Sequence, residues 1–352
     1  KPNNLPAPAS SFVGRVELIR EVTGLLKQSE VRLVTLVGPG GTGKSRLGLH
    51  VAQRLLPDYQ DGAFLITLAS LRQADLVPGT IAAALDIKQH DNRPVIESVV
   101  DSLRKKELLL LIDNLEQVQS AVTHIKTLVS KCPGVKILVT GREALRVGGA
   151  KTVRVPPFSL PDSRKASFSD IRDSESVQLF VERAQAVRAG FELTEDNAKD
   201  VLNICHRLDG LPLAIELATS RMRTMDVREL LDSMQQRFAV LQGGRDDLLD
   251  HQRSLQELIS WSYELLTEEE QTLWRRLAVF TGGAGLEAAE QVCDPDGEFI
   301  VDIEVEGLVD KSLANMSFNT LEGGEEEARV TMLDTLREYA LHKLEEAAEA
   351  EL

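Results

Sequence analysis

Apolar positions in the first half of the chain gather into short runs that are separated by longer polar or amphipathic stretches. Runs of strand length, rich in aliphatic residues, predict five strands at residues 31–37, 63–67, 108–113, 135–140 and 152–155. Apolar residues at broadly helical spacing follow the first run, at residues 47–56. Strands that alternate with helices form a parallel sheet covered on both faces. We therefore expect an α/β domain over residues 1–155, with a parallel sheet of five strands.

Strand signals stop at the two prolines 156–157, and helical periodicity follows. Residues 158–173 are polar and rich in Ser, Pro and Arg, which predicts a linker. Helices are expected at residues 176–187, 195–208 and 213–223. An Asp-Gly pair ends the second of these helices, and Pro212 suits the first turn of the third because its φ is fixed and it has no N–H to leave unpaired. The pattern predicts a helical domain over residues 156–250.

The last hundred residues combine helices with two short strands. Helices are expected at residues 254–266, 267–279, 286–292, 300–309 and 335–351, and strands at residues 312–318 and 329–332. The second helix begins with Thr267 and carries Glu270 three residues later, the pattern of a capping box. Three or more helices with a β-hairpin outline a winged helix, so we expect a winged-helix domain over residues 251–352.

The overall composition is typical of a globular protein, with 43% hydrophobic and 27% charged residues among 352. Residues 1–11 carry three prolines and no apolar core, so we expect a linker rather than a signal peptide, and a chain that is part of a longer protein. The longest apolar run, residues 108–112, is far shorter than the roughly 20 residues that cross a bilayer. Three widely spaced cysteines predict no disulfide framework and favour a reducing cytoplasm.

The charge is unevenly distributed. Residues 253–352 hold 7 basic and 24 acidic side chains, a local charge of −17, whereas residues 1–252 hold 33 and 31. A strongly acidic segment repels phosphate backbones. The last hundred residues are therefore poor candidates for binding nucleic acid, and we expect no membrane partner either.

A glycine-rich loop follows the first predicted strand directly. Residues 38–45 read Gly-Pro-Gly-Gly-Thr-Gly-Lys-Ser and match G-x-x-x-x-G-K-[ST] at every fixed position, between a strand and a helix as the motif requires. Glycines let backbone N–H groups turn toward phosphate groups, and the start of the helix adds positive potential. The residues expected to hold the nucleotide phosphates are Gly38, Gly40, Gly41, Thr42, Gly43, Lys44, Ser45 and Arg46. Lys44 is expected at the β and γ phosphates, and Ser45 at Mg²⁺.

An acidic residue ends the most apolar predicted strand. Asp113 follows five aliphatic residues, where an ionised side chain needs a partner, so we interpret it as the second Mg²⁺ ligand. Two residues are candidates for orienting the attacking water, Asn114 and Glu116. Asn cannot accept a proton as a base, which favours Glu116. The alternative for Glu116 is a solvated residue in the first turn of a helix.

A cation follows another predicted strand. Arg142 comes two residues after the strand at residues 135–140, at the carboxyl edge where ligands of open α/β sheets bind. Arg142 could then sense the γ-phosphate and distinguish ATP from ADP. The alternative is a surface arginine paired with Glu143 or Asp113.

With these residues in place, the chain resembles the STAND class of signal-transduction ATPases, and within it the bacterial NB-ARC-like modules of AfsR/SARP and LuxR-type regulators. The resemblance covers nearly the whole chain. Its seven ordered matches are FVGR at 12–15, VGPGGTGKSRL at 37–47, IDNLE at 112–116, LVTGRE at 138–143, CHRLDGLPLAIEL at 205–217, WSYELL at 261–266 and MLDTLREYA at 332–340.

The resemblance assigns further residues to the nucleotide. It implies that Val13 and Arg15 lie near the adenine and ribose, and that Pro212 packs against the base. It also implies that Asp334 belongs to a winged-helix motif that reads Met-His-Asp in relatives and closes over ADP. Leu333 stands where that histidine would contact the β-phosphate, so this chain departs from the family pattern there.

The function implied by the resemblance is a regulatory switch that binds ATP or ADP with Mg²⁺. The ADP form is closed, exchange for ATP opens the winged helix and permits self-association, and slow ATP hydrolysis resets the module. Effector and sensor domains lie outside this chain. Two other hypotheses remain: a DNA-binding module, against which the local charge of −17 weighs, and a constitutive ATPase or small-molecule kinase, which substrate-dependent turnover would reveal.

Overall fold

The computed structural model describes residues 1–349 except 9, 69–70, 72, 89–92, 116–120, 146, 242–249 and 321–325. The chain divides into two compact units, Lys1–Pro156 and Pro157–Leu352, which are described separately. The second unit contains residues of both the predicted helical and the predicted winged-helix domains. A boundary between these two domains stays a prediction.

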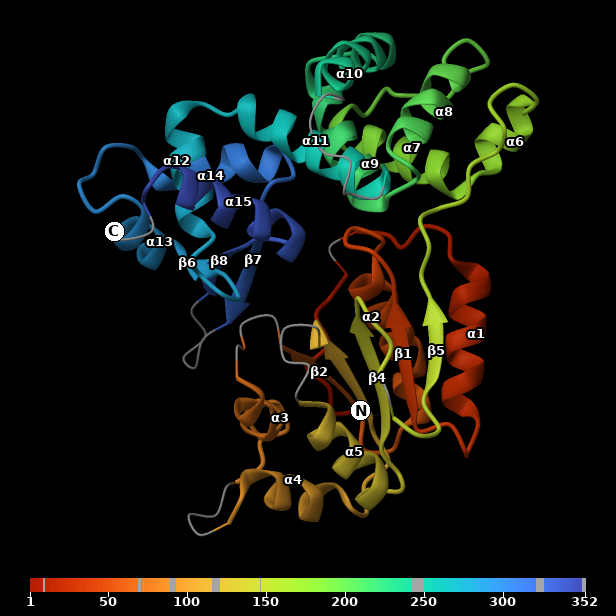
Figure 1. Ribbon diagram of the computed structural model, residues 1–352, viewed down its shortest axis with the longest axis vertical. Helices are drawn as coiled ribbons and strands as arrows, with labels where there is room; N and C mark the ends of the chain where they lie inside the picture. Colours follow the sequence, from red (N-terminus) through yellow and green to blue (C-terminus); the bar gives the residue numbers. More distant parts are fainter. Residues whose placement is uncertain are drawn as a thin grey trace. The chain divides into compact units, whose positions relative to one another are not determined.

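The first unit is built on a five-stranded parallel sheet (Figure 1). Its strands are β1 (Leu33–Val37), β2 (Ala63–Thr67), β3 (Leu109–Asp113), β4 (Lys136–Gly141) and β5 (Lys151–Arg154), in the order β2-β3-β4-β1-β5. All four neighbouring pairs are parallel, which confirms the predicted sheet. Val37 at the end of β1 pairs with Gly141 at the end of β4, so the chain leaves both strands at the same edge.

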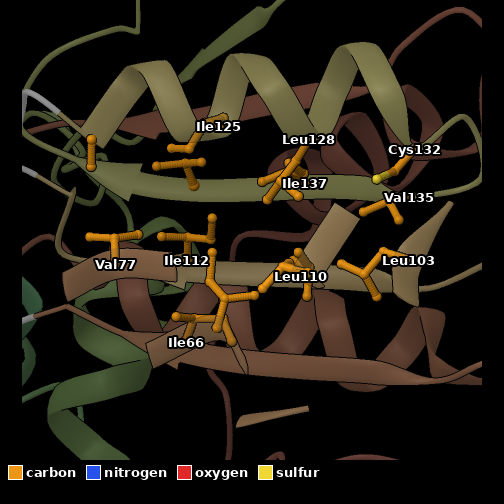
Figure 2. Packing of buried hydrophobic residues seen from close by; sticks show 14 of the residues in the cluster. Ile66, Val77, Leu103, Leu110, Ile112, Ile125, Leu128, Cys132, Val135 and Ile137 are labelled. Atoms are coloured by element: carbon orange, nitrogen blue, oxygen red, sulfur yellow. The ribbon is translucent and has the colours of Figure 1, made fainter. Parts of the chain in front are cut away.

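Helices cover both faces of this sheet, also as predicted. One apolar core lies under α1 (Val16–Lys27) and α2 (Lys44–Leu55). The other lies under α3 (Val77–Ala84), α4 (Val95–Leu103) and α5 (Val122–Lys131), and Figure 2 shows its packing. Strand β3 serves both cores, because successive side chains of a strand point to opposite faces. Leu109 and Leu111 join the first core, and Leu110 and Ile112 join the second.

The second unit begins with a group of helices. They are α6 (Phe168–Asp173), α7 (Glu175–Val187), α8 (Ala198–Arg207), α9 (Pro212–Ser220), α10 (Val227–Leu241) and α11 (Asp250–Glu264), with a 3₁₀ turn at Arg221–Arg223 after α9. The linker prediction for residues 158–173 was wrong at its end, where α6 forms. Ser167 and Asp170 make a capping box, and Ile171 is buried, so a short helix is stable in a polar segment.

The rest of the second unit combines helices with a small antiparallel sheet. Its elements are α12 (Glu268–Leu277), β6 (Ala284–Gly285), α13 (Leu286–Cys293), α14 (Val301–Asp310), β7 (Asn315–Thr320), β8 (Glu326–Thr331) and α15 (Asp334–Glu346). The sheet order is β6-β8-β7. Thr267 and Glu270 form the predicted capping box at the start of α12. Helices with a short hairpin agree with the winged-helix outline, and the winged-helix assignment itself stays a prediction.

Cysteines and hydropathy add two facts. Cys132, Cys205 and Cys293 are all buried and free. Within the described ranges, no helix has the length and apolar character that crossing a bilayer requires.

Candidate nucleotide-binding site

The glycine loop joins β1 to α2 in a backbone shape that requires glycine. Gly41 and Gly43 have φ values of 78° and 83°, in the left-handed region that side chains disfavour. A Cβ on Gly38 would lie 2.4 Å from the carbonyl oxygen of Val155. Gly40 lies between these positions. The loop therefore brings backbone groups closer together than residues with side chains would allow.

Lys44 extends along the loop that precedes it. Its ammonium donates hydrogen bonds to the carbonyl oxygens of Gly38 at 2.9 Å and Pro39 at 2.8 Å. The Thr42 hydroxyl also donates to Pro39, at 3.0 Å, and Thr42 is buried. Lys44 is the first residue of α2, so its charge lies at the positive end of the helix dipole. Positive charge and N–H groups are thus concentrated where a phosphate group could bind.

Asp113 lies at the carboxyl end of β3 and faces residues of two other elements. The Thr140 hydroxyl on β4 donates to Asp113 Oδ1, and the side chain of Ser45 is hydrogen-bonded to the same carboxyl group. Burial raises the pKa of Asp113 above its usual range, although hydrogen bonds from Thr140 and Ser45 and the charge of Lys44 oppose this shift. The protein groups around Asp113 only partly offset the cost of burying its charge, so a cation bound there would stabilise the ionised carboxylate. Together with the Ser45 hydroxyl it offers the oxygen ligands that Mg²⁺ prefers.

The backbone turns sharply after Asp113. Asn114 has a φ of 62°, an unusual value for a residue other than glycine. Its N–H donates to Thr140 Oγ1 at 3.1 Å. Thr140 thus holds both the carboxylate and the residue after it. Glu116, the other water-orienting candidate, lies outside the described residues.

Arg15 and Arg46 connect the loop to the segment before α1. Arg15 is buried at the start of α1, with a φ of 62°, and its guanidinium donates to the Thr42 carbonyl oxygen at 3.2 Å. Arg46 donates to Ser10 Oγ at 2.6 Å and to the carbonyl oxygens of Ser10 and Ser11. Val13 lies between Ser11 and Arg15 in the sequence, and it is half-buried. The segment that should approach the adenine is therefore tied to the loop that should bind the phosphates.

Arg142 lies at the same edge of the sheet. It follows Gly141, which pairs with Val37 just before the glycine loop, and its side chain is exposed. Its role stays a prediction.

Two further candidates belong to the second unit. Pro212 is the first residue of α9 and half-buried. The preceding Gly210 has a φ of 63°, and a Cβ there would lie 2.3 Å from the carbonyl oxygen of Phe158. Asp334 is the first residue of α15, and its side chain lies outside the described part of the chain. The approach of either residue to a nucleotide stays a prediction.

The sequence analysis did not single out Thr140, Ser10 or Ser11. The signal for Thr140 was present, because it is a hydroxyl residue at the end of an otherwise aliphatic strand and it precedes Gly141-Arg142. Ser10 and Ser11 gave no comparable signal. Both accept hydrogen bonds from Arg46 through backbone carbonyls that any residue would supply, and Ser10 adds its hydroxyl oxygen.

Comparison with known proteins identifies the first unit. Residues 15–156 match the NB-ARC domain. The uncharacterized protein Rv0894 of Mycobacterium tuberculosis is 35% identical over 347 residues, which cover 97% of this chain and 83% of that protein. Rv0890c of the same organism, which carries the name of an HTH-type transcriptional regulator, is 36% identical over 91% of this chain. The regulatory protein AfsR of Streptomyces coelicolor is 27% identical over 89%.

The chain is shorter than several of these relatives. It spans 35% of the length of Rv0890c and 31% of AfsR. Among solved structures, a STAND protein with a tetratricopeptide repeat sensor from Pyrococcus horikoshii has a similar fold, with a TM-score of 0.57 at 14% identity over 96% of this chain and 43% of that one. The chain belongs to the NB-ARC family of P-loop proteins, together with these mycobacterial relatives.

Proposed function

We propose that this chain is a regulatory ATPase module that binds Mg-ATP or Mg-ADP and changes its arrangement with the nucleotide. The observation that carries the proposal is the convergence of Lys44, Ser45 and the buried Asp113 at one edge of the sheet. The glycine loop and the Lys44 ammonium suit the phosphate chain of a nucleotide. The Ser45 hydroxyl and the Asp113 carboxylate suit its metal ion.

Each residue has a chemical task in this proposal. Backbone N–H groups of the loop and the Lys44 ammonium bind the β and γ phosphates. Ser45 and Asp113 hold Mg²⁺, which neutralises phosphate charge when it is bound. Arg142, beside the loop, contacts the γ-phosphate and distinguishes ATP from ADP. Glu116 orients the attacking water.

The adenosine moiety is bound by residues outside the loop. Val13 and Arg15 contact the adenine and ribose, which agrees with the hydrogen bond from Arg15 to Thr42. Pro212 packs on the base. Asp334 closes the site on the ADP side. The histidine of relatives is absent, because Leu333 occupies that position, and its side chain is 43% exposed.

A regulatory role is supported by the relatives, because Rv0890c and AfsR are both named as regulators. A nucleotide moves an equilibrium between two arrangements only as far as it prefers one of them, and a nearly complete switch needs about 5.5 kcal/mol of differential affinity. Arg142 contacts with one nucleotide and Asp334 contacts with the other supply such a difference. We propose slow hydrolysis, self-association in the ATP form, and effector and sensor domains elsewhere in a longer protein.

Two other functions receive less support. The charge of −17 over residues 253–352 disfavours a DNA-binding role for this chain. A constitutive ATPase is distinguished by its turnover, which should be fast and independent of any signal.

The test is to denature the purified protein and identify the released nucleotide by chromatography. A tightly held ADP that is absent from Lys44→Ala supports a closed resting switch despite Leu333. An empty or freely exchanging site with fast turnover contradicts the switch and favours a constitutive ATPase. Lys44→Arg is a useful companion, because it keeps the charge and alters the geometry of the donor.

A further inference from the structure

Residues 1–8 and 10–12, called the strap below, belong to the first unit but lie before the region that matches the NB-ARC domain. Their first part follows the outer edge of β2, the terminal strand of the sheet. Asn3 forms a parallel bridge with Ala63, and the Ala63 N–H donates to the Pro2 carbonyl oxygen at 3.2 Å. A terminal strand exposes unpaired N–H and C=O groups. The strap satisfies them as a short additional strand would.

The side chain of Asn4 extends this pairing. Its Nδ2 donates to the Leu65 carbonyl oxygen at 2.9 Å, and its Oδ1 accepts from the Leu65 N–H at 2.6 Å. The carboxamide of one residue thus replaces a peptide group opposite Leu65. The neighbouring Asn3 differs, because its side chain bonds only within the strap in the described contacts, to Lys1 and Leu5.

Gly62 is shaped to let the strap pass. A Cβ at this position would lie 1.8 Å from the Pro2 carbonyl oxygen, and its φ of 95° belongs to the region that glycine favours. The strand edge is therefore built around the strap.

The strap then crosses α2, the helix that begins with Lys44. Gln53 on α2 donates to the Pro6 carbonyl oxygen at 2.8 Å. Nearer the loop, Arg46 holds Ser10 and Ser11, and the ring of Phe12 stacks on His50 with 4.4 Å between the ring centroids. These contacts run along α2 toward its first turn, where Ser45 and Lys44 lie.

We propose that the strap is an integral part of the nucleotide-binding unit and that its docking is coupled to nucleotide binding through the Arg46 contacts. The coupling rests on the proposed function, whereas the docking of the strap on β2 does not. Coupled equilibria are reciprocal. A bound nucleotide that orders the first turn of α2 stabilises the docked strap, and the docked strap tightens nucleotide binding by the same factor.

The first measurement is amide-resolved hydrogen exchange on the full chain without nucleotide. Neighbouring amides in a strand point to opposite sides, so Ala63 and Leu65 face the strap while Phe64 and Ile66 face β3. We expect Asn4→Ala to speed exchange at Leu65 by about tenfold or more, because the variant loses both hydrogen bonds that the exposed Asn4 side chain makes with Leu65. Phe64 and Ile66 should stay protected.

Asn3→Ala is the matched control, because it removes the same side chain one residue earlier and should leave Leu65 protected. A variant lacking residues 1–8 should lose protection at both Ala63 and Leu65. If these two amides exchange equally fast in the full chain and in the shortened chain, the strap does not dock on β2.

The second measurement repeats the exchange with saturating Mg-ADP and determines the Kd of Mg-ADP by calorimetry. We expect at least about fivefold slower exchange at Ala63 and Leu65, and at least about fivefold weaker binding to the chain lacking residues 1–8. Mg-ADP that binds both chains equally and leaves the exchange unchanged overturns the coupling. Failure of the intact chain to bind Mg-ADP overturns the proposed function and the coupling together, while the first measurement still decides the docking.

Discussion

Thr140 joins β3 and β4 at the candidate site, and removing its hydroxyl tests how that edge of the sheet is held. The hydroxyl donates to Asp113 and accepts from the Asn114 N–H, and the residue is 1% exposed. Thr140→Val replaces the hydroxyl with a methyl group of similar size. The carboxylate then loses a hydrogen bond, and the Asn114 N–H loses one acceptor but keeps its hydrogen bond to the Asp113 carboxylate.

The expected effect follows from these two losses. A hydrogen bond to a charged group contributes about 1.5–3 kcal/mol, and a hydrogen bond between neutral groups, such as that from Asn114 to Thr140, contributes about 0.5–1.5 kcal/mol. The added methyl group returns about 0.8 kcal/mol. We expect the free energy of opening at this edge to fall by about 1–4 kcal/mol, which speeds hydrogen exchange of β3 and β4 by about 5- to 700-fold.

Thr35→Val supplies the matched control. Thr35 lies on the neighbouring strand β1, is fully buried, and its hydroxyl has no hydrogen-bond partner among the described residues. The same substitution should therefore leave exchange unchanged or slow it slightly. Both tryptophans, Trp261 and Trp274, lie in the second unit, so tryptophan fluorescence should report unchanged unfolding there for both variants.

Equal effects of the two valine substitutions, within about 0.5 kcal/mol, would refute this account, because Thr140 would then act only through its shape. A loss of Mg²⁺-dependent nucleotide binding in Thr140→Val alone would add that the hydroxyl positions Asp113. Rescue by Thr140→Ser would strengthen that conclusion, since serine restores the hydroxyl without the methyl group.

Two further predictions concern the second unit and use its tryptophan fluorescence during urea unfolding. Hydrogen bonds from Arg275 and Arg276 lower the pKa of Glu349, so its stabilisation is present above the pKa of the unfolded chain and is lost as the pH falls through the folded pKa. Glu349→Gln should cost about 1–3 kcal/mol at pH 7, and its difference from wild type should shrink between pH 5 and pH 3; a difference independent of pH contradicts this. Gly210→Ala should destabilise the unit by at least about 2 kcal/mol, because it combines a left-handed φ with a close approach to a backbone oxygen, whereas Gly190→Ala, with open space around it, should change stability little; similar effects of both would contradict the reasoning.

Periodicity predicted the first unit well, because its central strands β1, β3 and β4 are almost entirely buried and consist mostly of aliphatic residues. The run at residues 63–67 became β2 without any shift of its ends, and the others moved by one or two residues. Helix α6 was missed because a capping box and one buried side chain stabilise it in a segment whose composition is that of a linker. Helix α10 was not predicted either, although its 15 residues carry apolar positions at helical spacing.

The candidate site divides in the same way. Lys44, Ser45 and Asp113 were predictable, since each occupies a fixed place in a motif or at the end of a strand, and the fold brings them together. The contacts of Thr140 were harder to predict, because they depend on the register between β3 and β4, which pairs Ile112 with Val139. Register follows from the packing of side chains on both faces, and a single strand does not contain that information.

The contacts of the strap were not predicted, for a different physical reason. Three prolines and little apolar area predict a linker, because such a segment cannot bury enough surface to order itself. The folded sheet and helix α2 order the strap. The edge of β2 offers backbone groups to pair with, Gly62 leaves room because it has no side chain, and the Arg46 guanidinium donates to the carbonyl oxygens of Ser10 and Ser11. The docked strap therefore depends on the folded sheet, and its order should be lost before the sheet unfolds. Residues 1–12 are consequently the part of the first unit in which a weak coupling to the phosphate loop would have the largest visible effect.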